Sequence, residues 1–249
     1  MKKTYLSFLL LFVGAVLFMS AGKKPVTLFL VGDSTMADNL ELDATAERGW
    51  GQLLPSYQTG NVVIANFSGA KESTKSVLLE GTWKEVINRL HRKDIVFIEL
   101  GHNDEQSLDV QHYTTVDVYE DNLMTMVKEA QKKGAKVVLL TPVARRYFLD
   151  SVAYPRHGAY PEAVRRVAKR MEVPVIDLTA KSEAWLVEVG EDASAPYYAE
   201  DNVNLTEDGA LLVGRMAVED LQKKEFKFMK GLFAIPDSVE VRYTTPVQR

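Results

Sequence analysis

Five short runs rich in Val, Ile, Leu and Phe recur along the chain, and each holds a continuous apolar stretch rather than an alternating one. They are VTLFLVGDS (26–34), NVVIANFS (61–68), DIVFIELGHND (94–104), AKVVLLTPV (135–143) and VPVIDLT (173–179). A strand that is covered on both faces shows this pattern, whereas a strand with one wet face alternates. We therefore predict five strands of a sheet that is buried on both sides.

Segments whose apolar residues recur at helical spacing lie between and after these runs, at 73–90, 118–134, 160–171 and 206–224. The last helix is expected to start at Thr206, a favourable N-cap, with Glu207 and Asp208 in its first turn. Repeated strand–helix alternation predicts an α/β domain with a parallel sheet and helices on both faces. In such sheets, binding and catalytic sites lie beyond the carboxyl ends of the strands.

The two ends of the chain depart from this pattern. Residues 1–22 combine the basic start MKK, the apolar run YLSFLLLFVGAVLFM and the small residues SAG, which is typical of a secretory signal peptide. A membrane anchor is the alternative, although the run of 15 residues is short for a bilayer. We expect cleavage near Ala21 or Gly22, export to the periplasm or the medium, and no membrane attachment afterwards. Residues 23–225 would form the domain, and residues 226–249 an extension with one strand and a loose end.

Composition narrows the possible partners and chemistry. Hydrophobic residues make up 46% and charged residues 26%, as in a soluble globular protein. The chain has no cysteine, which excludes disulfides and a thiolate nucleophile. Without the signal segment it carries 28 basic and 34 acidic residues, a net charge of −6, and no basic patch with interleaved aromatics, so we expect no nucleic-acid partner. No metal-ligand cluster is visible, and we expect a monomer that needs neither metal nor cofactor.

Three segments with chemical potential follow predicted strands. Ser34 in GDST ends the first run, where its hydroxyl would be exposed at the rim of the sheet or would act as a helix N-cap. Asn103 in GHND ends the third run and could donate to a developing oxyanion, or form a turn with Asp104. The loop NFSGAKES after the second run could aim backbone N–H groups at the same point. One hydroxyl and two sources of donors at neighbouring strand ends suit acyl transfer.

These segments, in this order, resemble the SGNH (GDSL-type) hydrolases, and in particular the branch of rhamnogalacturonan acetylesterases. The resemblance runs from Val26 to about Gln222 and includes GDSTMA, ERGWGQLLPSY (47–57), NFSGAKESTKSVLLEGTWKEV (66–86), VFIELGHND (96–104), VVLLTPVARRYF (137–148), RHGAYPEAVRRVA (156–168) and EDNVNLTEDGA (200–210). It implies the SGNH hydrolase fold, a flavodoxin-like three-layer α/β/α arrangement with a five-stranded parallel sheet. It also implies removal of acetyl groups from pectin-type polysaccharides or oligosaccharides by a nucleophilic serine, without a cofactor.

The resemblance assigns roles to matching positions. Ser34 would be the nucleophile, and its backbone N–H and the Asn103 side chain would stabilise the oxyanion. Asp201 would orient the catalytic histidine, although a surface or capping role is the alternative. The position of that histidine holds Asn204, while Asp201 and the Gly-Ala pair at 209–210 keep their spacing.

The second block also departs from the family pattern. The oxyanion glycine and the arginine after it fall on Lys71 and Glu72. Lys71 keeps a backbone N–H donor but not the close approach that glycine allows, and Gly69 would compensate in part.

The missing histidine is the more serious departure, because a serine hydroxyl needs an adjacent base. Loss of a triad base leaves roughly 10³–10⁴-fold acceleration over water, so the sequence predicts weak turnover. His157, in RHGAYP, is a candidate surrogate base, and Lys71 in a Ser-Lys arrangement is a second. A non-catalytic relative that binds an acylated glycan or a partner is the alternative function.

Overall fold

The computed structural model describes residues 25–39, 47–245 and 247. The predicted signal peptide, residues 1–22, lies outside them. Within the described residues, no helix has both the length and the apolar character needed to cross a membrane.

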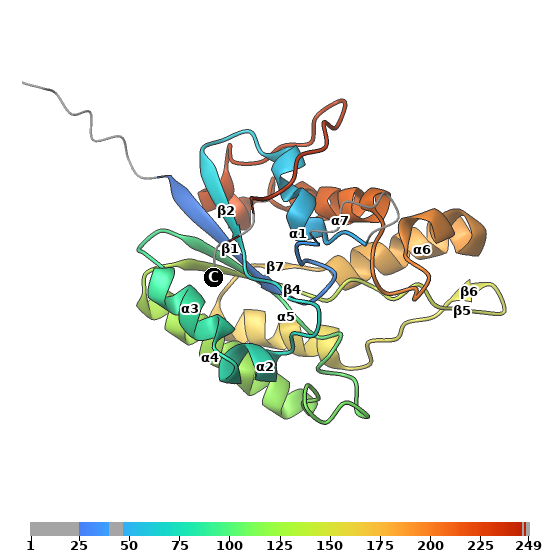
Figure 1. The fold of residues 1–249 in the computed structure, drawn as a ribbon, viewed down its shortest axis with the longest axis horizontal. Helices are drawn as coiled ribbons and strands as arrows, with labels where there is room; N and C mark the ends of the chain where they lie inside the picture. The colour runs from blue at the N-terminus through green and yellow to red at the C-terminus, as the bar shows by residue number, and fades with distance from the viewer. Residues whose placement is uncertain (1–24, 40–46, 246, 248–249) are drawn as a thin grey trace, which may run out of the picture.

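The five predicted strands form one parallel sheet (Figure 1). They are β1 (Val26–Gly32), β2 (Val62–Asn66), β3 (Ile95–Glu99), β4 (Lys136–Leu140) and β7 (Val175–Ile176). Their order in the sheet is β2-β1-β3-β4-β7, which is the flavodoxin-like order. Because the direction of winding reverses between β1 and β3, the crevice beyond their carboxyl ends is the expected place for a site.

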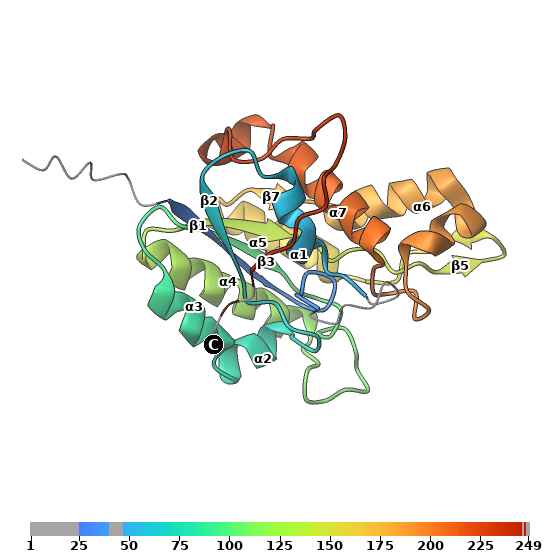
Figure 2. The same ribbon diagram turned by 45° about the horizontal axis from the view of Figure 1, so that its top comes forward.

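Helices cover both faces of the sheet, as the two views in Figures 1 and 2 show. One face carries α1 (Trp50–Leu53), α6 (Leu178–Ser194) and α7 (Glu207–Asp220), and the other carries α2 (Thr74–Leu79), α3 (Thr82–Arg89), α4 (Val116–Lys132) and α5 (Tyr160–Met171). Alternate residues of β1 face the two cores: Leu28 and Leu30 pack with the first set of helices, and Phe29 and Val31 with the second. The predicted three-layer α/β/α fold is confirmed.

The predicted helix 73–90 is two helices, α2 and α3. Gly81 separates them with φ +104°, and a Cβ there would meet nothing within 4 Å. The positive φ itself is what favours glycine and ends the first helix. At the start of α2, the side chains of Ser73 and Ser76 each accept from the other's backbone N–H.

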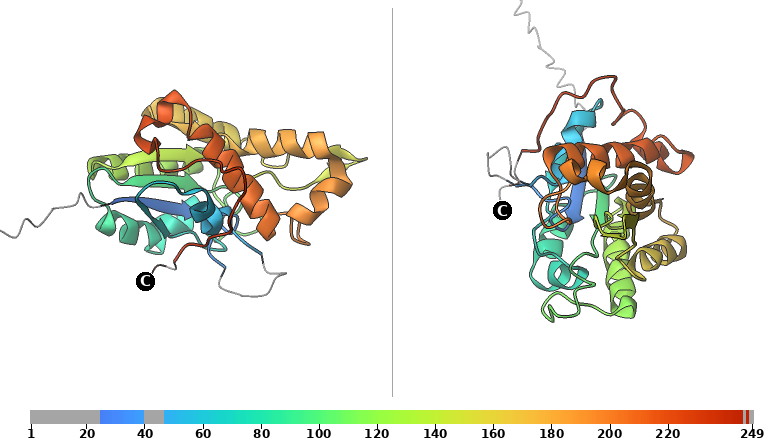
Figure 3. Two further views of the ribbon diagram at one scale, coloured as in Figure 1. Left: turned by 90° about the horizontal axis from the view of Figure 1, so that it is seen from above. Right: turned by 90° about the vertical axis from the view of Figure 1, so that its right-hand side faces the viewer.

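Helices α1 and α6 and the hairpin of β5 (Phe148–Leu149) and β6 (Val152–Ala153) were not predicted. Helix α6 buries the polar Thr179 and Ser182 along with Leu178 and Leu186, which weakens its apolar periodicity. The two strands of the hairpin are too short to show alternation. Figure 3 shows the hairpin projecting from the body beside α6.

The C-terminal segment packs into the domain rather than extending from it. Phe226 and Met229, in the 3-10 helix η3 (Lys224–Met229), are buried in the same core as α7. The expected strand is reduced to an isolated bridge between Phe233 and Gln58. Further along, Thr244 is buried against the body of the protein.

Candidate active site

The turn after β1 carries Ser34 to the carboxyl edge of the sheet. Asp33 Oδ1 accepts hydrogen bonds from the backbone N–H of Thr35 at 3.1 Å and from its hydroxyl at 2.9 Å. Residues 34–36 therefore form a tight turn and no helix, which removes the alternative role of Ser34 as an N-cap. Ser34 is half-buried, and no described residue makes a hydrogen bond to its hydroxyl.

A close backbone contact holds this turn in place. Trp50 N–H donates to Thr35 O at 2.8 Å. A Cβ at Gly49 would lie 2.2 Å from Ala37 O and 2.4 Å from Ala37 N, so only glycine permits the approach. The ERGWG segment thus supports the nucleophile turn from the side of α1.

A pocket of about 260 Å³ opens at Ser34, and its lining consists of Ser34, Ala37, Asp38, Asn39, Glu47, Gly49, Ser68, Gly69 and Ala70. Two carboxylates, Asp38 and Glu47, are the ionisable groups of this lining, and sequence reasoning missed both. The sequence could have indicated both, because Asp38 directly follows GDSTMA and Glu47 is the first residue of ERGWG. Asp38 Oδ1 accepts from Asn66 Nδ2 at 2.8 Å and from Thr244 Oγ1 at 2.6 Å.

A buried polar network lies behind the Ser34 turn. His102 Nδ1 lies 3.0 Å from Asp33 Oδ2, and its Nε2 lies 2.9 Å from Val143 O. Glu99 Oε2 accepts from Trp50 Nε1 at 2.8 Å, and Oε1 accepts from Val143 N–H at 3.2 Å. These bonds tie the ends of β1, β3 and β4 to α1 and fix the strand tips relative to one another.

The charges in this network are set by burial and by one ion pair. Burial works against the charged forms of both Asp33 and His102, yet their mutual attraction holds the pKa of Asp33 below and that of His102 above its ordinary value. Burial, reinforced by the charge of Asp33, raises the pKa of Glu99 to about 8. Asp33, Glu99 and His102 place potential metal-ligand atoms within 4.8 Å of one another, but each of these side chains is engaged in the hydrogen bonds above.

Asn103 lies on the turn after β3, half-buried, as expected. Its Nδ2 donates to the backbone O of Glu72 at 2.8 Å, which joins this turn to the second block and leaves the other amide hydrogen for an oxyanion. The Glu72 side chain accepts from Ser76 and Thr82, so it anchors the starts of α2 and α3. Gly69 lines the Ser34 pocket, whereas Lys71 is exposed and does not.

The loop 198–205 brings Asp201 and Asn204 together. A single bridge between Tyr198 and Leu205 closes the loop. Asp201 Oδ1 accepts from the backbone N–H groups of Val203 and Asn204, each at 2.9 Å. Arg48, whose sequence neighbours line the Ser34 pocket, donates its backbone N–H to Leu205 O at 2.8 Å and so fixes the loop beside that pocket.

Asn204 retains half of the family dyad. Its Nδ2 donates to Asp201 Oδ2 at 2.7 Å, the bond that a triad histidine would make through Nδ1. Its Oδ1 is buried and accepts no hydrogen bond from the described residues. An amide oxygen is not basic enough to take the proton of a serine, so the dyad has an orienting acid but no base.

His157 and Lys71, the two candidate surrogate bases, offer no base to Ser34 in this arrangement. His157 is buried, with Nδ1 3.0 Å from Glu105 Oε2 and Nε2 2.7 Å from Val143 O. Both ring nitrogens face acceptors, so no lone pair is directed at the nucleophile. Burial, the largest influence, lowers the pKa of His157 against the opposing effect of Glu105. Lys71 makes no hydrogen bond to Ser34.

A serine at the switch point of a flavodoxin-like sheet, with an aspartate on the loop before α7, is the arrangement expected of a carboxylic ester hydrolase. The profile of the GDSL-like Lipase/Acylhydrolase family matches residues 30–212, and the chain belongs to this family.

Two named relatives are similar over most of their length. The rhamnogalacturonan acetylesterase RhgT of Bacillus subtilis is 32% identical over 217 residues, which cover 81% of this chain and 91% of that protein. The probable rhamnogalacturonan acetylesterase YesY of the same organism is 28% identical over 79% of this chain and 92% of that protein.

Solved structures confirm the fold. The Bacillus subtilis protein YxiM superposes with a TM-score of 0.72 at 22% identity, covering 80% of this chain and 56% of that one. Axe2, an acetylxylan esterase from Geobacillus stearothermophilus, gives 0.62 at 18% identity, covering 81% and 96%.

Proposed function

We propose that this protein is an exported carbohydrate acetylesterase whose substrate is an acetylated pectin-type polysaccharide such as rhamnogalacturonan, and whose turnover is slowed by Asn204. The observation that carries the proposal is the half-buried Ser34 hydroxyl, open to a pocket at the strand ends. Relatives named for acetyl esters of rhamnogalacturonan and xylan support the substrate class. Export rests on the signal-like pattern of residues 1–22.

In this function, Ser34 Oγ attacks the acetyl carbonyl and the sugar hydroxyl leaves. Water then attacks the acetyl-serine and releases acetate. The free hydrogen of the Asn103 amide and the backbone N–H groups of Ser34 and Ala70 supply donors for the oxyanion, whereas the Gly69 N–H already donates to Gly32 O at 3.1 Å. The slow step is proton removal from Ser34, because the ionisable groups of the pocket are the carboxylates Asp38 and Glu47, which are weaker bases than imidazole.

The Asp201–Asn204 pair favours a second candidate function, a non-catalytic glycan-binding protein. The pair is joined by a 2.7 Å bond that needs no substrate, and its geometry is intact without a base. Such a protein would bind the glycan in the same pocket without hydrolysing its acetyl ester.

One substitution separates these functions. Asn204→His restores an imidazole whose Nδ1–H can donate to Asp201. General-base assistance contributes typically 10²–10⁴-fold, so we expect kcat to rise by roughly that factor. Hydrolysis of 4-nitrophenyl acetate and acetate release from acetylated rhamnogalacturonan are the measurements, for the parent, Ser34→Ala and Asn204→His.

Two controls make the result specific. Asn204→Ala removes the amide without adding a base and should show no gain, and the double variant Ser34→Ala/Asn204→His should be inactive. Parent activity that Ser34→Ala abolishes supports the esterase. A parent no faster than Ser34→Ala would overturn it in favour of the binder; a gain from Asn204→His would then identify the missing base as the cause, and no gain would show that the second block is also broken.

A further inference from the structure

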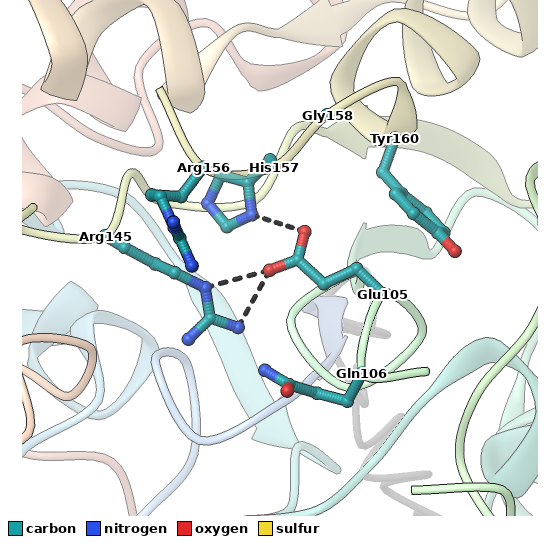
Figure 4. A pocket seen from close by; sticks show the side chains of 7 residues that line it. All are labelled: Glu105, Gln106, Arg145, Arg156, His157, Gly158 and Tyr160. Carbon is teal, nitrogen blue, oxygen red and sulfur yellow. Dashed lines mark hydrogen bonds and ion pairs between the residues drawn. The ribbon is translucent and has the colours of Figure 1, made fainter. Parts of the chain in front are cut away.

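A second pocket of about 460 Å³ lies at the same edge of the sheet, beyond β3 and β4 (Figure 4). Its lining is Glu105, Gln106, Arg145, Arg156, His157, Gly158 and Tyr160. Glu105 is clamped between two partners. Its Oε1 accepts from Arg145 Nε at 2.8 Å, and its Oε2 lies 3.0 Å from His157 Nδ1. Both carboxylate oxygens are therefore occupied, and Glu105 serves to position its neighbours.

The side chain of Arg145 is held in place by hydrogen bonds, and its Nη1 donors have no acceptor among the described residues. Its Nη2 donates to His102 O at 3.1 Å and also lies 2.8 Å from Glu105 Oε1, and the side chain is only 16% exposed. No described residue accepts from its Nη1. A guanidinium fixed in this way is preorganised for an anionic ligand, because binding costs it little further side-chain entropy.

Arg156 supplies a second cation to the same pocket. Its guanidinium lies 4.5 Å from the centroid of the Tyr147 ring, and it makes no ion pair with any described residue. The pocket therefore contains two arginines and one carboxylate, Glu105, whose charge Arg145 balances. This leaves the pocket locally positive in a protein of net charge −4. Carboxylate and phosphate are the anions that guanidinium groups bind with paired hydrogen bonds.

The position of this pocket connects it to the Ser34 site. Gln106 N–H donates to Asn103 O at 3.2 Å, so the pocket begins one turn beyond the candidate oxyanion donor. Arg146, next to Arg145, donates its backbone N–H to Asn202 O at 2.9 Å in the loop that carries the dyad. A polymer with an acetyl group at Ser34 would therefore pass the Asn103 turn and place another sugar here.

The β5–β6 hairpin adds apolar surface beside the cations. Tyr147 and Tyr154 flank its two short strands and are 40% and 54% exposed, with their rings 6.2 Å apart at 73°. Aromatic rings offer flat apolar faces to the C–H face of a sugar, while neighbouring arginines bind its acidic group. A free phosphate or a peptide carboxylate would use only the arginines.

We propose that the pocket of Arg145 and Arg156 is a subsite for the carboxylate of a uronic acid residue of the glycan. The inference rests on the proposed function, since the same glycan carries the acetyl group that reaches Ser34. The paired donors of Arg145 Nη1 and the Arg156 guanidinium hold the carboxylate, and the hairpin tyrosines contact the ring.

Calorimetric titration of the full chain at low salt tests the subsite. The probes are trigalacturonic acid and its methyl ester, which has the same shape without the charge. We expect the acid to bind roughly 10-fold or more tightly than the ester, and Arg156→Gln to remove that difference. Arg170→Gln is the matched control, since Arg170 is exposed at the far end of α5, ten residues or about 15 Å from Tyr160, and should bind like the parent.

The acid-against-ester comparison needs no variant, so a folding defect cannot obscure it. Equal affinity for acid and ester, no detectable binding of the acid, or an equal effect of Arg156→Gln and Arg170→Gln would each overturn the subsite. Failure of the proposed function gives a different result, namely ester hydrolysis that is the same in the parent and in Ser34→Ala. Binding measured in Ser34→Ala should match the parent, because the subsite does not depend on the nucleophile.

Discussion

Gly49 is a residue whose missing side chain shapes the active-site turn. Its backbone φ of −79° is open to any residue, so conformational freedom is not the reason for glycine. A Cβ at this position would overlap the backbone of Ala37, which cannot rotate away as a side chain could. We therefore expect Gly49→Ala to lower the free energy of unfolding by about 3 kcal/mol or more, as severe overpacking does. Urea unfolding measures it.

Gly81→Ala is the matched comparison for Gly49. It has open space around a Cβ but a φ of +104°, so it should cost only about 1–2 kcal/mol, the ordinary cost of a left-handed conformation. Equal losses in the two variants would show that the contact between Gly49 and Ala37 is not tight.

At the same scale, the sequence located the candidate residues but not their partners. Ser34, Asn103 and Asp201 could be placed because each follows a recognisable motif. The engagement of His157 could not be foreseen, since Glu105 is 52 residues away and meets it only through the fold. The roles of these residues in catalysis remain predictions until the Asn204 variants are assayed.

At the scale of elements, the strand tips are joined by Glu99, a carboxyl group whose pKa is raised by burial and by the charge of Asp33. Its pKa of about 8 in the folded protein compares with 4.5 for the ordinary side chain. Between these values the folded state binds more protons than the unfolded state, so the free energy of unfolding falls as pH rises and levels off above about pH 8. A difference of one pH unit between the two pKa values corresponds to about 1.4 kcal/mol, so the total loss is a few kcal/mol.

Glu99→Gln should flatten this slope between pH 6 and pH 8. His102, whose pKa is also raised, contributes with the same sign. Because the charge of Glu99 is one cause of that shift, the difference between parent and variant contains the direct effect of Glu99 and its effect on His102. We expect the variant to be less stable at pH 6. Both Glu99 oxygens accept hydrogen bonds, so the NH₂ group of glutamine would place a donor against the Trp50 Nε1–H or the Val143 N–H and lose that bond. Glu219→Gln, at a half-exposed carboxylate, should keep the slope of the parent. An unchanged slope in Glu99→Gln would mean that Glu99 is ionised when buried.

Helices and strands could be predicted from the sequence where all of their buried residues are apolar. The five strands are apolar on both faces, and their sequences showed it directly. Helix α6 was missed because its buried face includes hydroxyl groups: Ser182 Oγ donates to Leu178 O at 2.6 Å and accepts from Ala144 N–H at 2.9 Å. A buried helix face that contains hydroxyl groups can be recognised only when the groups that they hydrogen-bond are known. The boundary at Gly81 was hidden because α2 and α3 each continue an apolar pattern.

At the scale of the whole molecule, the C-terminal tail contacts Asp38, one of the residues that line the Ser34 pocket. Thr244 Oγ1 donates to Asp38 Oδ1 at 2.6 Å across 206 residues of sequence, and Thr244 N–H donates to Gln52 O at 2.8 Å. Arg242 N–H donates to Ser56 Oγ at 2.8 Å. No local pattern predicts contacts of this range, which explains why the sequence indicated a loose extension instead.

Deletion of residues 237–249 should therefore weaken the fold and the pocket together. Each lost hydrogen bond contributes about 1 kcal/mol, and the freed chain regains some entropy, so we expect a loss of about 2 kcal/mol in urea unfolding. Thr244→Val removes the hydroxyl bond to Asp38 and should cost about 1 kcal/mol. Because Asp38 lines the Ser34 pocket, both variants should also alter the affinity for an acetylated oligosaccharide. A deletion that leaves stability and affinity unchanged would show that the tail does not hold Asp38 in solution.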